Sequence, residues 1–385
     1  MNTDSIAHTP DRRRWVPGVL LVALIACAPA LATAQIARGI DSGSSTLPAT
    51  EIEIHEAAFP EVVTAIRNGA GRLQLISWRL GETIRRTGDS GNQAGKVGEI
   101  ALVRLGRLVT AVRTAEGDLK LISWRHTSGP TAATFERLGD SGDQAGRASQ
   151  IAIALVPDPA AGSRLVTAVR TREGRLRLIS WDLGGDGSFL RRGDSGDLAG
   201  EASRIALAAI GRDLLLTAVR TAEGELELIA WRISADGRSF TRLADSGSQA
   251  GKVSEIAMTS DGRVTAVRTA ERRLKLIRWE IASDGSRIRR IGDSGNQAGR
   301  ASLIALSSVG GDAYVTAVRT AEGILRLISW RAEDGGGIAR TGDSGNQAGK
   351  VSAIAMTRPP VSNRFVTAVR DRAGRLKLIQ WTVDR

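Results

Sequence analysis

Cysteine and histidine are scarce in this sequence, and their scarcity limits its chemistry. Cys27 is the single cysteine among 385 residues, so an intramolecular disulfide and a cysteine-ligated zinc site are excluded. The only histidines are His8, His55 and His126, which excludes a histidine-rich metal centre. The sequence places no nucleophile or carboxylate pair beside His55 or His126, and phosphate-loop and dinucleotide fingerprints are missing. We therefore predict a protein that is not an enzyme and has no catalytic residue, metal or cofactor.

Aromatic residues and helical patterns are also scarce. Aromatic residues make up 4% of the chain, and eight of the fourteen are tryptophan. After residue 34 no segment approaches 18 consecutive apolar residues, so we expect no transmembrane helix in the mature chain. No apolar stripe with the period of an α-helix runs for 12 residues or more, so helices should be few. A content of 42% hydrophobic and 24% charged residues is typical of globular proteins and excludes wholesale disorder.

Residues 1–34 have the features of an export signal. Arg12–Arg14 precede an apolar stretch from Val16 to about Leu31, and Ala32-Thr33-Ala34 matches a cleavage site of the A-x-A type. Leu24-Ile25-Ala26-Cys27 also resembles a bacterial lipobox, in which Cys27 would be lipidated. We therefore expect an exported bacterial protein that is periplasmic, associated with the outer membrane or extracellular. A lipoprotein and a freely secreted form stay open as alternatives.

Residues 35–385 consist of one unit repeated seven times. Each unit contains an Asp-Ser-Gly motif, an isoleucine, a Thr-Ala-Val/Ile-Arg run and a tryptophan, in this order. The aspartates of the motif are Asp41, Asp89, Asp140, Asp194, Asp245, Asp293 and Asp343. The arginines that end the run are Arg67, Arg113, Arg170, Arg220, Arg268, Arg319 and Arg370. The tryptophans are Trp78, Trp124, Trp181, Trp231, Trp279, Trp330 and Trp381.

Each unit reads as four short strands, which is typical of a β-propeller blade. The repeat begins with IARGIDSG, which matches the fourth-strand sequence IARTGDSG at 338–345, and the chain ends after a third strand at Trp381. A fourth strand at the N-terminus and three strands at the C-terminus would complete one shared blade and leave no open sheet edge. We predict an all-β, seven-bladed β-propeller of four-stranded antiparallel blades as a single domain over 35–385, with the ring closed in this way.

Two spacings are constant and two are variable. The distance from Asp to the following Ile is 11 residues in all seven units, and so is the distance from Arg to Trp. By contrast, Ile to Arg varies from 12 to 19 residues, and Trp to the next Asp from 11 to 16. In a propeller the fourth-to-first and second-to-third connections share one face of the ring. That face should therefore carry uniform loops that pack or bind, and the other face loops of variable length.

The sequence allows two roles for each of the repeated aspartates, arginines, glutamines and tryptophans. The Asp-Ser-Gly aspartates suit tight turns, and a calcium loop is the alternative. The seven arginines are expected to pair with carboxylates, and an exposed anion-binding ring is the alternative. A glutamine follows the motif as Gln93, Gln144, Gln249, Gln297 and Gln347. Its amide suits either a hydrogen bond between loops or contact with a hydroxyl-rich ligand. The tryptophans could pack between blades or stack on sugar rings.

The residues resemble the seven-bladed β-propeller superfold, and the presence of one tryptophan in each near-identical unit is loosely similar to bacterial propeller lectins. This resemblance implies a non-enzymatic module that binds a multivalent ligand such as a surface glycan through the repeated loops. An envelope scaffold for protein–protein interactions is the second hypothesis, and a propeller lyase or lactonase the third. The net charge of +12 also allows weak binding of anionic polymers. We expect a monomer.

Overall fold

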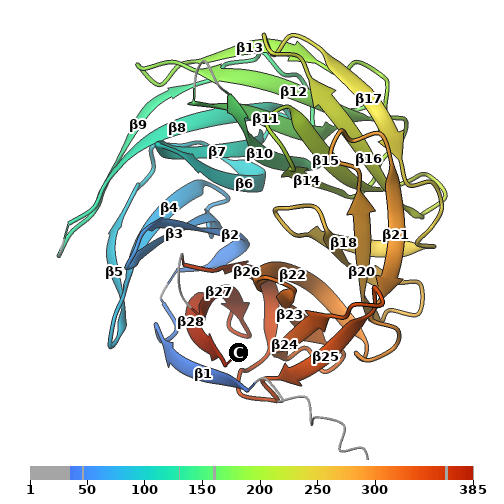
Figure 1. The fold of residues 1–385 in the computed structure, drawn as a ribbon. Coiled ribbons are helices and arrows are strands. Elements are labelled where there is room, and N and C mark those ends of the chain that lie inside the picture. Colours follow the sequence, from blue (N-terminus) through green and yellow to red (C-terminus); the bar gives the residue numbers. More distant parts are fainter. Residues whose placement is uncertain (1–34, 46, 130, 159–161, 360–362, 385) are drawn as a thin grey trace, which may run out of the picture. The chain divides into compact units, whose positions relative to one another are not determined.

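The computed structural model describes residues 35–385, except for 46, 130, 159–161, 360–362 and 385. All the regular structure of these residues is β: 28 strands form seven four-stranded antiparallel sheets, arranged in a ring (Figure 1). The fold is a seven-bladed β-propeller, which confirms the prediction. The expected export signal, with Cys27, lies outside the described residues. Within the described part, no helix has the length and apolarity needed to cross a membrane.

Each blade contains four strands, numbered here by their order within the repeat. The first strands are β2 (Ala49–Ala58), β6 (Val97–Leu105), β10 (Ile151–Asp158), β14 (Ile205–Ala209), β18 (Val253–Met258), β22 (Ala301–Gly310) and β26 (Val351–Thr357). The second strands are β3 (Glu61–Asn68), β7 (Arg107–Thr114), β11 (Gly162–Arg170), β15 (Leu214–Arg220), β19 (Val264–Thr269), β23 (Ala313–Thr320) and β27 (Arg364–Asp371). The third strands are β4 (Leu73–Leu80), β8 (Leu119–Thr127), β12 (Leu176–Leu183), β16 (Leu226–Ile233), β20 (Leu274–Ile281), β24 (Leu325–Ala332) and β28 (Leu376–Val383). The fourth strands are β5 (Ile84–Asp89), β9 (Thr134–Asp140), β13 (Phe189–Asp194), β17 (Phe240–Asp245), β21 (Ile288–Asp293), β25 (Ile338–Asp343) and, from the N-terminal end, β1 (Ile36–Asp41).

The first strands form the inner wall of the ring. Each first strand contacts the first strands of the two neighbouring blades, and β2 contacts β26 to complete the circle. The second, third and fourth strands follow outward in the order of the sheet. A central channel is therefore bordered by seven strands of the same sequence pattern.

The ring closes where the sequence predicts. Strand β1 pairs antiparallel with β28, with Ile36 opposite Val383 and Arg38 opposite Trp381. In Figure 1 the two strands lie side by side, one blue and one red. Ile36 is buried in the cluster that contains Trp381 and Val383. Because β1 supplies the fourth strand of the last blade, that blade has no unpaired third strand.

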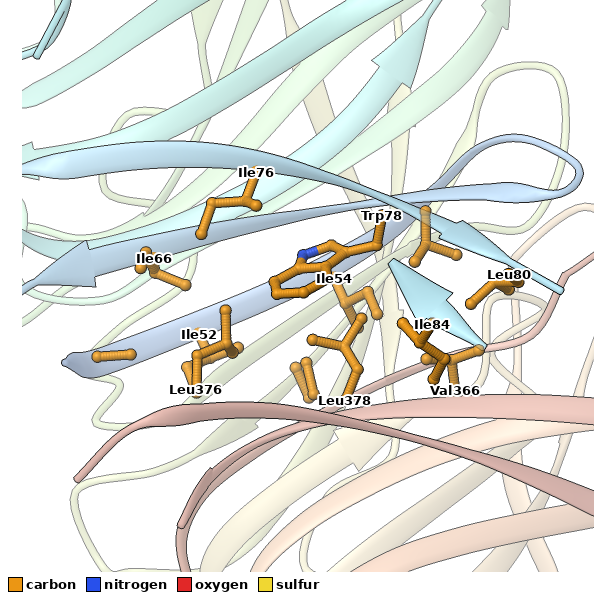
Figure 2. Packing of buried hydrophobic residues seen from close by; sticks show 14 residues of the cluster. Ile52, Ile54, Ile66, Ile76, Trp78, Leu80, Ile84, Val366, Leu376 and Leu378 are labelled. Carbon is orange, nitrogen blue, oxygen red and sulfur yellow. The ribbon is translucent and has the colours of Figure 1, made fainter. Parts of the chain in front are cut away.

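The tryptophans occupy the interfaces between blades. All seven are 0–3% exposed. Each indole Nε1 donates a hydrogen bond of 2.9–3.0 Å to the threonine of the Thr-Ala-Val/Ile-Arg run in its own blade, as Trp78 does to Thr64. Figure 2 shows Trp78 packed among Ile54, Val366 and Leu378, so that the first and last blades share one apolar cluster. Since a buried tryptophan removes about 150–250 Å² from water, these contacts stabilise every blade interface.

A glycine precedes five of the seven Asp-Ser-Gly motifs, and in several blades it allows the neighbouring blade to approach closely. A methyl group on Gly88 would overlap the carbonyl oxygen of Ala133, which lies in the third-to-fourth connection of the next blade. Gly139 faces Gly187, and Gly292 faces Gly336, in the same way. These glycines are required by the backbone of a neighbouring blade and not by an unusual φ angle.

Candidate ligand-binding face

The uniform loops gather at one end of the ring, which we call the loop face. It carries the seven Asp-Ser-Gly loops, each leading into a first strand, and the turns between second and third strands. Each turn pairs with the loop that enters the next blade, as Arg72 does with Lys96, and the seventh pair joins Arg375 to Pro48. Backbone bonds from Val97 N to Gly71 O and from Leu73 N to Gly95 O support the first of these pairs. The pairing holds both connections at constant length around the whole ring.

Each Asp-Ser-Gly motif ends a fourth strand with a fixed set of hydrogen bonds. In the second blade Asp140 Oδ1 accepts a bond from Gly142 N, and its other oxygen pairs with Arg137, three residues earlier. Ser141 Oγ accepts a bond from Leu121 N on the third strand, and Ser141 N donates to Leu121 O. The Asp–Arg pair recurs in all seven blades. The structure thus places these aspartates in turns.

Neighbouring groups lower the pKa of Asp140. Partial burial acts to raise the pKa of Asp140, but the bond from Gly142 and the charges of Lys120 and Arg137 outweigh it. The pKa of Asp140 therefore lies below its usual value, and the carboxylate is ionised at neutral pH. Sequence reasoning had not identified the arginine three residues before each aspartate, although it recurs in every unit.

The glutamines predicted as ligand contacts join adjacent blades. Gln144 Nε2 donates to Phe189 O, and its Oε1 accepts from Arg191 N, both at the start of the next fourth strand. Arg191 also donates through Nη1 to Gln144 O. The bond from the fourth-strand arginine N to the glutamine Oε1 recurs at Gln93, Gln249, Gln297 and Gln347. These amides are engaged in contacts between blades, so the function proposed below does not depend on them.

The tryptophans predicted as stacking platforms are interior residues. Because each is almost completely buried between blades, no indole face is available to a sugar on the surface. Their position corresponds to the packing role that the sequence also allowed.

The arginines of the Thr-Ala-Val/Ile-Arg run do not have the partners expected from the sequence. Arg170 donates from Nε to Ala202 O in the next blade and from Nη1 to Ser149 Oγ, just before the first strand of its own blade. Arg220 and Arg319 make the equivalent bonds. Among the described residues, none of the seven arginines forms an ion pair, so the expectation of carboxylate partners was wrong. Carbonyl and hydroxyl oxygens of the inner strands take that place.

Two cavities of matching composition open on the loop face between blades. One, of about 390 Å³, lies between the fifth and sixth blades and is lined by Arg300, Val318, Thr320, Arg326, Ile328 and Asn346, among others. The other, of about 450 Å³, lies between the sixth and seventh blades and is lined by the equivalent residues Lys350, Val369, Asp371, Lys377, Ile379 and Ser44. Each combines cations and aliphatic side chains with a polar residue of the next loop, and each also contains a carboxylate. The carboxylate is Glu322 in the first cavity and Asp371 in the second, where Arg38, Arg372 and Arg375 add further cations.

Two cations of each cavity have equivalents at other blade interfaces, and we call them basic pairs. One cation lies seven residues after the motif aspartate, and the other lies between the two leucines that start the third strand. The basic pairs are Lys96 with Lys120, Arg147 with Arg177, Lys252 with Lys275, Arg300 with Arg326, and Lys350 with Lys377. The interface of the third and fourth blades instead carries Glu201 and Glu227, and that of the seventh and first carries Pro48 and Gln74. Five of the seven interfaces are thus basic, one is acidic and one is uncharged.

The first cation of each basic pair is solvent-exposed. Lys96, Arg147, Lys252, Arg300 and Lys350 are exposed, and none has an ion-pair partner among the described residues. The second cation is held in place more firmly. For example, Lys377 pairs with Asp41 at 2.9 Å, and Arg326 donates to Asn346 at 2.9 Å. The pairs of Arg326 and Lys377 thus each have one free cation and one that a neighbouring side chain holds in place.

Three glutamates, Glu51, Glu53 and Glu99, lie on the inner strands of the first two blades, and Glu53 breaks the repeat. Glu53 occupies the place of an alanine in the six other units, such as Ala101, and a comparison of the units would have revealed it. Burial raises the pKa of Glu53 to about 8, and the charges of Glu51 and Glu99 act in the same direction. Burial also raises the pKa of Glu99 to about 7, although a bond from Ile151 N opposes this. The channel wall of the first two blades therefore carries carboxyl groups that are partly protonated at neutral pH.

A buried pair breaks the repeat at the opposite face of the ring. Glu61 and the side chain of His126 are each about 3% exposed, and His126 Nε2 lies 3.9 Å from Glu61 Oε2 and 3.3 Å from Ser77 Oγ. The imidazole stacks on Phe135 with the ring centroids 4.8 Å apart. Burial lowers the pKa of His126, although the charge of Glu61 opposes it. His126 also lines a cavity of about 390 Å³ together with Arg104, Arg107 and Leu138.

Within the described residues, no cluster of three or more histidine, cysteine, aspartate or glutamate side chains is arranged to hold a metal ion. No protein-family model matches this chain, and no curated protein matches it either, so the fold and the loop face carry the functional argument.

Proposed function

We propose that this protein is a multivalent, lectin-like binding module that takes anionic glycans on its loop face. The observation that carries the proposal is the recurrence of a basic pair at five blade interfaces, with cavities of about 390 and 450 Å³ at two of them. Lysine and arginine recognise the carboxylate or sulfate group of such a glycan. The aliphatic and polar lining suits a sugar ring with its apolar face and hydroxyl rim.

The arrangement favours a polymeric ligand over a single sugar. Each basic pair is open to solvent, so one site alone binds weakly. Five equivalent sites on one rigid ring make the later contacts intramolecular once the first has formed, and this raises the overall affinity. A polysaccharide with regularly spaced anionic groups satisfies this geometry. Export, which the sequence predicts, would bring the protein to the compartment where such polymers occur.

The proposal is tested with the exported protein and an immobilised polyuronate, with a neutral polysaccharide as control, at about 50 and 300 mM salt. We expect retention on the polyuronate that persists in part at the higher salt. Replacing one basic pair, as in Lys350→Gln with Lys377→Gln, should weaken retention. The acidic interface provides the matched control, because Glu201→Lys with Glu227→Lys creates a sixth basic pair and should strengthen it.

Two results would overturn the proposal. One is equal retention of the wild type and both double variants. The other is binding that disappears completely at the higher salt and does not distinguish a polyuronate from inorganic polyphosphate, because this indicates charge attraction alone. Absence of binding at either salt would favour a protein partner.

A further inference from the structure

The seven arginines of the Thr-Ala-Val/Ile-Arg run form a ring at the mouth of the central channel on the loop face. Each lies at the end of a second strand, next to the inner wall. In six blades its Nη1 donates to a hydroxyl on or beside the adjoining first strand, at 2.9–3.3 Å. The second blade has Gly98 at that position, and Arg113 fills the space that a side chain would take. The hydroxyl bonds attach these guanidinium groups to the start of the adjoining first strand.

The guanidinium groups retain unused hydrogen-bond donors. None of the seven has a carboxylate partner among the described residues, and no Nη2 group of the seven donates a hydrogen bond there. None of these Nη2 atoms is among the buried unpartnered atoms, whereas the Nε atoms of Arg67, Arg113, Arg268 and Arg370 are. All seven side chains are partly exposed. Each arginine therefore presents one amino group to solvent.

The turn above each arginine helps to fix its orientation. In five blades a substituent on the turn glycine would meet the guanidinium group, as at Gly174 above Arg170 and Gly323 above Arg319, with Nη2 3.1 and 3.2 Å away. The backbone of the turn thus covers one side of the group. The donors are preorganised before any ligand arrives, which lowers the entropy lost on binding.

Negative charge near the ring is unevenly distributed. Five of the turns carry a glutamate whose pKa is lowered, namely Glu116, Glu173, Glu223, Glu271 and Glu322. Glu51 interacts electrostatically with Arg67 and Arg113, and Glu99 with Arg113. Seven like charges arranged around one axis repel each other, and these carboxylates reduce the positive potential that the arginines create. At the inner-strand position beside the ring, the blades carry Glu51, Glu99, Gln150, Arg204, Glu255, Leu303 and Ala353 in turn. Glu255 is paired with Arg204 at 3.3 Å, and the pKa values of Glu51 and Glu99 are raised mainly by burial. The sixth and seventh blades, with Arg319 and Arg370, have no acid at this position.

We propose that the arginine ring is a central site for one compact polyvalent oxyanion, a small molecule with several phosphate or sulfate groups. Such a ligand places anionic oxygens in several directions at once and can accept bonds from guanidinium groups of different blades. The site is separate from the basic pairs, which lie farther out between blades, and it does not depend on the proposed glycan binding. One ligand binds per protein molecule, because there is one channel mouth on this face.

The stoichiometry provides the first test. Isothermal titration of the exported protein with myo-inositol hexakisphosphate as probe should show one site per molecule, and the same probe should raise the melting temperature. Inorganic phosphate at equal ionic strength should bind far more weakly, because it has one phosphate group. A stoichiometry of several probes per molecule would overturn the proposal, since it would place the anions on the repeated basic pairs.

Variants provide the second test. Arg319→Gln and Arg370→Gln should each weaken probe binding about tenfold, which corresponds to the loss of one charge-assisted hydrogen bond. Arg319→Lys keeps the charge and should retain most of the affinity, and this separates loss of binding from loss of folding. The matched control is Lys350→Gln with Lys377→Gln, which should leave probe binding unchanged while weakening glycan binding. Unchanged binding in folded Arg319→Gln and Arg370→Gln proteins would exclude the ring as the site.

Discussion

The two faces of the ring join neighbouring blades through different kinds of contact. On the loop face, seven equivalent backbone pairs join the turn of each blade to the loop of the next. At the opposite face, third-to-fourth connections contact the neighbouring blade through backbone carbonyl groups, such as those of Ala133, Gly187 and Arg238. Backbone pairing at every interface requires one loop length, whereas contact with a single carbonyl tolerates several. The constant spacings therefore follow from the backbone contacts between blades.

The two faces also differ in the arrangement of their charged residues. The loop face repeats its charges, with one arginine per blade near the channel and a basic pair at five interfaces. The opposite face buries one unrepeated pair, Glu61 and His126. Repetition suits a ligand that contacts many blades, while a single buried pair acts on the stability of one interface.

The largest difference between the faces should come from glycine substitutions. Gly88→Ala places a methyl group on the carbonyl of Ala133 and should reduce the free energy of unfolding by about 3 kcal/mol. Gly91→Ala, on the loop face, has free space but a φ of 56° and should cost about 1 kcal/mol. Thermal and denaturant unfolding measure both. A larger effect of Gly91→Ala would show that the opposite face packs less tightly than described.

Two buried serines of one blade provide a finer comparison. Ser141→Ala, on the loop face, leaves the buried Leu121 N–H without its hydroxyl partner and should cost about 2 kcal/mol. Ser123→Ala, towards the opposite face, removes a bond to the carbonyl of Gly187, 2.6 Å away, and should cost about 1 kcal/mol. Equal effects in denaturant unfolding would mean that the two contacts contribute equally to the free energy of unfolding.

The glutamine contact can be removed at one loop and added at another. Gln144→Leu loses the bonds to Phe189 and Arg191 and should cost about 1 kcal/mol. Leu198 is 53% exposed and stands where five other loops carry glutamine, so Leu198→Gln should stabilise by a similar amount. Denaturant unfolding of both variants gives the values, and a loss of stability in Leu198→Gln would contradict the interpretation.

The pH dependence of stability should show effects of opposite sign for two buried groups. Glu53 has its pKa raised from 4.5 to about 8, so the folded state binds more protons and stability is lost as the pH rises from 4.5 through 8. The pKa of His126 is lowered from 6.5, so its contribution is present above 6.5 and is lost as the pH falls through its folded value. Glu53→Gln should therefore raise the melting temperature at pH 9 but not at pH 4. His126→Asn should reduce the loss of stability in acid. An effect of the opposite sign in either variant would refute the direction assigned to the pKa of that residue.

The fold could be predicted from the sequence because each blade repeats the same landmarks at the same distances. The pairing of β1 with β28 followed from the match between IARGIDSG at the start of the repeat and the fourth-strand sequence IARTGDSG at 338–345. The partners of Arg170 could not be predicted, since Ala202 O belongs to another blade and a carbonyl group has no signature in the sequence. Gln144 was ambiguous for the same reason, because an amide serves a ligand and a neighbouring backbone equally well. Glu53 was overlooked because it shows only when all seven units are compared at that position.

Closure by β1 and β28 has a consequence for the order of folding. Arg38 bonds to Gln347, 309 residues further along the chain, so this contact forms only when nearly all of the protein has been synthesised. Six blades consist of consecutive segments and can form from local hairpins, whereas the seventh requires the two ends to meet. Until then β1 and β28 each present an unpaired edge that another chain could join. The last step of folding is thus the one most exposed to domain exchange, and dilution should favour the closed monomer over linked rings.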